Sequence, residues 1–327
     1  MKQLYILPMI FSLAACTTTV VDEPDADASV PIGFTSQAEA RAIVTENNLP
    51  DGSFFKVWGG HSGNNVFQGR EVQKTASGCT YQGTEYWVAG ETYHFCAIYP
   101  ADLTGVEVTD DGSVAITGFD CSRTDDGAVD LMTASATAVS ADGMIANSGS
   151  VPLKFQHLLS LLTFSFKNQL TSYAIDITNL RLSIVARGDY QSSPSPSWVN
   201  LASDKSVFTF HPADNPLQME TGASASTSLL VIPQSNADVT VTFTVNIRKN
   251  YDTGGSLVYS KRYTASLSTG NTASNAWKIG YRYNYTATIP ATIMEGEDIT
   301  LTVSVKDWDE ENANVSWGGK DENSNNS

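Results

Sequence analysis

The sequence has few of the residues that metal sites and catalysis most often need. Among its 327 residues are four cysteines and four histidines, which are His61, His94, His157 and His211. The histidines are far apart and no CxxC pair occurs, so we expect neither a metal site nor a cofactor. No GxSxG motif and no phosphate-binding glycine loop is present. We therefore predict no catalytic residue and a protein that is not an enzyme.

Positive charge is also scarce. The chain has 19 lysines and arginines against 35 aspartates and glutamates, a formal net charge of −16. This balance excludes nucleic acid as a partner, because little in the chain could neutralise phosphates. It also disfavours binding to an anionic membrane surface. Acidity of this kind is typical of a protein kept soluble outside the cell.

Long apolar runs are limited to the first residues. Residues 1–15 have one positive charge, an apolar run and two small residues, which is the pattern of a secretory signal peptide. The LAAC sequence that ends at Cys16 matches the bacterial lipobox, so we predict lipidation of Cys16 and anchoring by several acyl chains, palmitate among them. An ordinary signal peptide that ends near a cysteine is the alternative. The acidic residues 16–28 are expected to form a solvated tether, either as a signal for the outer surface or for solubility alone.

The cysteines that follow Cys16 are odd in number. Cys79, Cys96 and Cys121 allow at most one disulfide and leave at least one free thiol. The alternation of residues 93–99 places Cys96 opposite the aromatic residues of the same strand, as a small buried side chain. If a disulfide forms, Cys79 and Cys121 are the more natural pair, and the sequence does not decide whether it does.

Helical periodicity is nearly absent, and short alternating apolar runs separated by Gly, Asn, Asp and Ser indicate an all-β protein. Strands are expected in the first half at 30–34, 55–58, 86–88, 94–99 and 114–116. They are expected in the second half at 151–155, 162–166, 175–184, 207–210, 229–232, 239–247, 257–267, 281–289 and 299–305. The polar stretches 119–146, 191–197 and 268–275 are predicted loops, and GGHSG at 59–63 is predicted to be a turn rather than an oxyanion hole.

The change of character near residue 150 predicts two domains. We expect an N-terminal β-sandwich at 29–149, a C-terminal β-sandwich at 150–317 and a disordered tail at 318–327.

Several motifs in this order and spacing are similar to those of a known family. They are VPIGF (30–34), FKVWG (55–59), HFCAIYPA (94–101), DLMTAS (130–135), VPLKFQHLLSLLTFSFKN (151–168), SLLVIPQ (228–234), WKIGYRYNYTATI (277–289) and ITLTVSVKDW (299–308). Together with the lipobox they resemble the fimbrillin family of Bacteroidetes, the subunits of type V pili, over most of the chain. The resemblance implies two transthyretin-like β-sandwich domains in tandem behind a lipidated N-terminal tether.

The resemblance also implies assembly by strand exchange. A protease would cut after an arginine in the early loop, here Arg41, and the first strand would leave. In this sequence that strand carries Val30, Ile32 and Phe34, which alternate. The vacated groove would accept a strand of the next subunit, and we expect this donor to come from residues 299–317, which carry Val303, Val305 and Trp308. The alternative for Arg41 is an ordinary surface charge on a short helical turn.

The expected partners follow from this reading. They are other pilus subunits, outer-membrane lipid through Cys16, an arginine-specific protease, and host or bacterial surface ligands. The expected location is the surface of the outer membrane and, after processing, the fimbrium. A second candidate function is a monomeric glycan-binding surface lipoprotein, in which Trp58, Trp87 and Trp198 would form a sugar platform instead of filling cores. A surface hydrolase is disfavoured because its motifs are missing.

Overall fold

The computed structural model describes residues 29–36, 49–124, 128–147, 150–249, 255–268 and 275–307, together with the backbone of 315–317. Almost all regular structure in these ranges is β-strand, which confirms the all-β prediction. The two helical elements are the short helix α1 (Ala141–Asn147) and the 3-10 turn η1 (Ile293–Glu295). No helix in the described ranges is long and apolar enough to cross a membrane.

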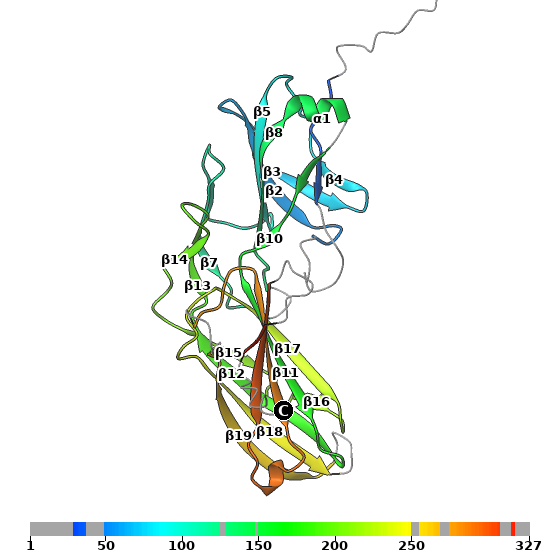
Figure 1. Ribbon diagram of the computed structural model, residues 1–327, viewed down its shortest axis with the longest axis vertical. Helices are drawn as coiled ribbons and strands as arrows, with labels where there is room; N and C mark the ends of the chain where they lie inside the picture. Colours follow the sequence, from blue (N-terminus) through cyan, green and yellow to red (C-terminus); the bar gives the residue numbers. More distant parts are fainter. Residues whose placement is uncertain are drawn as a thin grey trace, which may run out of the picture.

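A six-stranded antiparallel sheet forms the upper lobe in Figure 1. Its order is β10 (Gln156–His157), β8 (Met132–Ser140), β5 (Thr92–Tyr99), β2 (Phe54–His61), β3 (Asn64–Thr75) and β4 (Gly78–Tyr81). Two further strands, β1 (Phe34–Ser36) and β9 (Val151–Leu153), pair in parallel, and their buried side chains share a core with this sheet. The first core therefore combines the start of the chain with residues just after 150.

The β2–β3 hairpin explains the glycine-rich GGHSG motif. Ser62 and Gly63 have φ values of 43° and 76°, the backbone that a two-residue hairpin turn requires. A Cβ atom at Gly60 would lie 1.8 Å from the carbonyl oxygen of Asn64, so only glycine fits this close approach of the two strands. The motif is thus structural, as expected from the sequence.

A four-stranded sheet lies at the middle of the molecule, in the order β14 (Ser197–Val199), β13 (Arg187–Gln191), β7 (Val114–Asp120) and β6 (Val106–Val108). It joins two strands from each half of the chain through the antiparallel β7–β13 pair. These contacts, and those of β9 with β1, cross the domain boundary expected at residue 150. That boundary stays a prediction, which proteolysis can test.

Two five-stranded sheets form the lower lobe in Figure 1. One has the order β17 (Ser224–Val231), β11 (Ser160–Asn168), β20 (Tyr281–Ile289), β21 (Thr300–Asp307) and β22 (Val315–Trp317). The other contains β15 (Ser206–Phe210), β12 (Tyr173–Ile184), β18 (Thr240–Lys249) and β19 (Leu257–Ser266), with β16 (Leu217–Met219) also paired to β12. Their inner faces, together with the central sheet, form the second core.

Strand β5 separates the two cores. Tyr93, Phe95 and Ala97 pack in the first core, whereas Cys96 and Ile98 on the opposite face pack in the second. The predicted alternation of this strand is confirmed, and both of its faces are buried because a layer of structure covers each one.

Some expected elements are wrong. Residues 119–146 were expected to be loops, yet they contain β8 and α1. β8 has few large side chains, but it pairs with β5 and buries Met132 and Ala134. Its place in the sheet, and not its composition, therefore determines that it is a strand. The expected strand at 86–88 is reduced to one isolated bridge between Tyr86 and Pro31. The polar strands β3 and β4 were not expected.

Candidate functional site

The N-terminal segment, residues 29–36, has the alternating burial that its sequence predicts. Ile32 and Phe34 are each 2% exposed and belong to the first core, while Val30 is half-buried against it. The ring of Phe34 packs edge-on against the rings of Phe67 and Phe95, with both centroid distances at 5.3 Å. One face of the segment thus fills an aromatic slot in the upper lobe.

The backbone of the segment is held from two sides. The Ile32 amide donates to the carbonyl of Glu85 at 2.7 Å, and the Trp87 amide donates to the carbonyl of Val30 at 3.0 Å. On the other side, the Val151 amide donates to the carbonyl of Gly33 at 2.9 Å, where the parallel β1–β9 pairing begins. Each of these ladders is short, so few hydrogen bonds secure a segment whose side chains are deeply buried.

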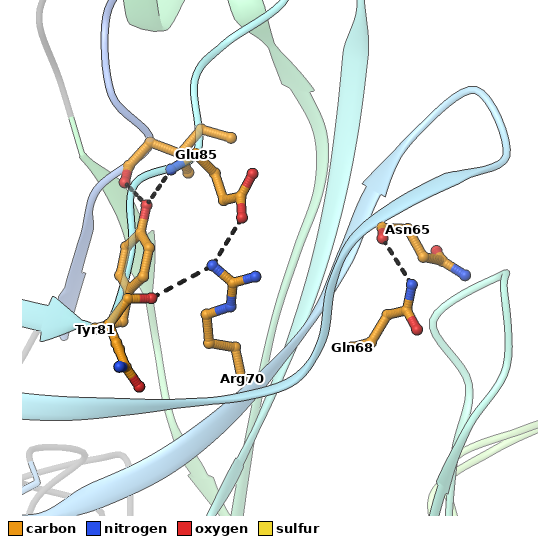
Figure 2. A network of polar contacts seen from close by, with 7 residues as sticks. Asn65, Gln68, Arg70, Tyr81 and Glu85 are labelled. Carbon is orange, nitrogen blue, oxygen red and sulfur yellow. Dashed lines mark hydrogen bonds and ion pairs between the residues drawn. The ribbon is translucent and has the colours of Figure 1, made fainter.

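A polar network connects this segment to strand β3 (Figure 2). The Tyr81 hydroxyl donates to the carbonyl of Ile32 at 2.8 Å and accepts from the Glu85 amide at 3.3 Å. Arg70 Nη1 lies 2.7 Å from Glu85 Oε1 and donates to the carbonyl of Gln82 at 3.5 Å. Burial raises the pKa of the Tyr81 hydroxyl, so it stays a neutral donor at physiological pH.

The Arg70 guanidinium also lies over aromatic rings. Its central carbon is 5.4 Å from the Phe67 ring centroid and 5.9 Å from that of Tyr81, within the range of cation–π contacts. A groove of about 620 Å³ borders it, lined by residues of β2, β3, β4 and the following turn, among them Phe54 and Gln82. Arg70 is therefore packed on one side and open to solvent on the other.

The predicted donor residues lie in the chain's own lower lobe. Val303 and Val305 are 8% and 7% exposed, and their strand β21 pairs with β20 on one side and β22 on the other. Their alternation matches that of Ile32 and Phe34, as expected for strands that could occupy equivalent places. Cys16, Arg41 and Trp308 fall outside the described residues.

Residues 41–308 match the fimbrillin-like family. The chain belongs to this family. Its role is accordingly that of a pilus subunit or adhesion protein at the cell surface, and the predicted resemblance is confirmed. A search of curated proteins finds no match.

Solved structures share the fold of this fimbrillin-like chain. A candidate cell-adhesion protein of Bacteroides uniformis is 18% identical, with a TM-score of 0.56 over 86% of this chain and 100% of its own. A fimbrial protein of Bacteroides vulgatus is 16% identical, with a TM-score of 0.51 over 85% of this chain and 99% of its own. A further candidate cell-adhesion protein, from Bacteroides ovatus, is 15% identical, with a TM-score of 0.51 over 87% and 99%. At these identities the likeness establishes the fold alone.

The cysteines of the fimbrillin-like chain that the structure describes are free thiols. Cys79 packs against the first core and Cys121 lies in the second, so the disulfide considered between them is not formed. Burial raises the pKa of Cys96 to about 12 and that of Cys121 to about 11. These two thiols are unreactive near neutral pH, whereas Cys79 is only half-buried.

The structure does not bring together the histidines or the tryptophans that the sequence offered as candidates for metal binding and glycan binding. Within the described ranges, no group of three or more His, Cys, Asp and Glu side chains could hold a metal ion. His61 pairs with Glu91 and, elsewhere, His157 pairs with Asp130. The tryptophans of the glycan-binding alternative do not form an exposed platform: Trp87 is 5% exposed, and Trp58 and Trp198 are partly buried against the second core.

Proposed function

We propose that this chain is exported as a lipoprotein, anchored through Cys16 at the surface of the outer membrane, and assembled into a pilus by protease-triggered strand exchange. Cleavage after Arg41 releases the N-terminal segment, and a strand of a neighbouring subunit takes its place. The assembled pilus contributes to adhesion to host or bacterial surfaces. One observation carries the proposal. Ile32 and Phe34 are deeply buried, although few backbone hydrogen bonds secure the segment to which they belong.

The energetics of the segment support this mechanism. Burial of Ile32 and Phe34 stabilises the closed state by roughly 1.5–3 kcal/mol per side chain. Covalent attachment adds a high local concentration, which cleavage after Arg41 removes. Departure would then leave an apolar slot together with unpaired backbone groups, which a complementary strand of another subunit can satisfy.

The donor is drawn from residues 299–317 of a neighbour, with Val303, Val305 and Trp308 entering the slot. Since β21 lies inside its own sheet, donation requires this strand to separate from β20. β22 is the outermost strand of that sheet and would separate first. An intact subunit therefore keeps its donor paired until a vacated slot is available.

Polymerisation in vitro tests the proposal. Mature protein incubated with an arginine-specific protease should convert from monomer to ladders, and the Arg41→Ala variant should stay monomeric. Arg187→Ala is a matched control, because Arg187 is an arginine of the central sheet, away from the N-terminal segment, whose side chain is half exposed. Normal polymerisation of the Arg41→Ala protein in the presence of the protease would show that cleavage elsewhere, or none, drives assembly.

A further inference from the structure

One side of the N-terminal segment is bonded to residues 81–87, and this stretch is itself held by Arg70. We propose that Arg70, Tyr81 and Glu85 form a clamp that sets how readily the N-terminal segment opens. The use of such a clamp in assembly rests on the proposed function, but its effect on opening does not. The three residues are called the Arg70 clamp below.

Glu85 links the two halves of the clamp. Its carboxylate pairs with Arg70 at 2.7 Å, and its carbonyl oxygen accepts the Ile32 amide at 2.7 Å. The ion pair thus holds the same residue whose backbone pairs with the segment. The Tyr81 hydroxyl closes the arrangement, because it accepts from the Glu85 amide and donates to the Ile32 carbonyl (Figure 2).

Arg70 is positioned by contacts on several sides. The rings of Phe67 and Tyr81 support its guanidinium, and the Gln82 carbonyl accepts a hydrogen bond from it. Gly83 follows with a φ of +87°, a backbone that favours glycine, and turns the chain past Arg70. An arginine restrained in this way loses less rotamer entropy on pairing than one on an open surface.

The clamp remains accessible from the groove. The side chains of Arg70 and Glu85 are 31% and 30% exposed, so their attraction is partly shielded from water and still reached by ions. Salt should therefore loosen the clamp, while the apolar contacts of Ile32 and Phe34 remain. The segment is held by two kinds of interaction that respond differently to the medium.

Amide hydrogen exchange in the intact mature protein measures opening directly, because local opening exposes particular amides without global unfolding. The amides to follow are those of Ile32, Trp87 and Val151. The Ile32 amide donates from the segment to Glu85, and the other two donate to carbonyl groups of the segment. In Arg70→Met, Glu85→Gln and Tyr81→Phe, we expect exchange of the Ile32 and Trp87 amides to be about three- to tenfold faster. Amides of β12 and β18 should not change, which shows that the variants fold.

Two controls match the chemistry elsewhere in the chain. Arg187→Gln removes an arginine–carboxylate pair, with Asp204, on the central sheet. Tyr283→Phe removes a hydroxyl that accepts the Lys278 amide in the lower lobe, as the Tyr81 hydroxyl accepts that of Glu85. Neither variant should speed exchange at Ile32. Arg70→Lys should give an intermediate rate, because it keeps the charge and loses the planar fork.

Equal exchange at Ile32 in Tyr81→Phe, Arg70→Met and the Arg187→Gln control would overturn the clamp. So would acceleration that spreads equally to β12 and β18, since that is loss of global stability alone. Cys79 lies on β4 beside β1, so the rate at which a thiol reagent labels it gives a second readout, resolved by peptide mass. In the clamp variants this labelling should become faster together with exchange at Ile32. Faster opening of the segment in the variants, in a protein that does not polymerise with the protease, would support the clamp and contradict the proposed assembly. Protease-triggered polymerisation with unchanged exchange at Ile32 in the variants would support the assembly and contradict the clamp.

Discussion

Replacing Phe34 with alanine removes the largest side chain of the N-terminal segment. Phe34 is 2% exposed and packs edge-on against Phe67 and Phe95. Truncation of a buried phenylalanine typically costs about 3–5 kcal/mol. In a segment that can open on its own, however, the loss cannot exceed the free energy that holds the segment closed, because beyond that point the segment opens and the rest of the lobe stays folded.

The matched comparison is Phe166→Ala. Phe166 is also 2% exposed, packs against Phe243 with a ring-centroid distance of 5.1 Å, and lies on β11, which is paired with a strand on each side. Its loss should lower the free energy of global unfolding by the full amount of about 3–5 kcal/mol. We expect Phe34→Ala to lower it by less and to abolish protection of the Ile32 amide.

Urea unfolding followed by tryptophan fluorescence gives the global free energy, and amide exchange gives the local one. Thr35→Ala, a truncation of the next residue on the same strand, which is only half-buried, should change neither strongly. If Phe34→Ala destabilises the whole protein as much as Phe166→Ala, with no preferential exchange at Ile32, the segment is an inseparable part of the upper lobe. The reasoning that it can be released would then be refuted.

Three other properties can be checked. Cys16→Ser protein should no longer incorporate labelled palmitate or partition into detergent; unchanged partitioning would contradict the lipid anchor. Stability should fall as the pH rises from about 9 to about 12, because burial raises the pKa of Cys121 to about 11 and that of Cys96, Tyr190 and Tyr283 to about 12, so the unfolded chain loses these protons first; circular dichroism against pH measures this. A protease cut within 135–150 should give two bands on a denaturing gel that co-elute in native chromatography, since β7 pairs with β13; fragments that elute separately would show independent domains.

Local pattern predicted much of the fold. The alternation of residues 175–184 and 239–247 correctly located β12 and β18, which pair with each other at the centre of a sheet. Such strands carry large apolar residues at every second position, and these are the residues that a sheet face must bury. The same signal placed Ile32 and Phe34 in the first core.

Strand pairing and the clamp could not be read in this way. The β7–β13 and β1–β9 pairs join residues far apart in sequence, and alternation shows which side chains point together but not which strands become neighbours. Arg70 is one of several charged residues on β3, a strand too polar to be expected. Its partner Glu85 becomes adjacent only because the β3–β4 hairpin and the following turn bring the chain back.

The proposed release can be placed on a concentration scale. If burial of Ile32 and Phe34 holds the segment by about 4 kcal/mol, the attached segment is open for about one molecule in a thousand. With an effective concentration of about 1 mM for a short tether, the same contacts after cleavage correspond to a dissociation constant of about 1 μM. A cleaved segment at a cell surface is diluted far below that value and leaves, whereas the uncut segment stays closed. A clamp that contributes a factor of about ten moves this constant between about 10 and 1 μM. The Arg70 clamp would therefore tune how long the cleaved subunit keeps its slot covered, while cleavage itself determines whether the slot opens.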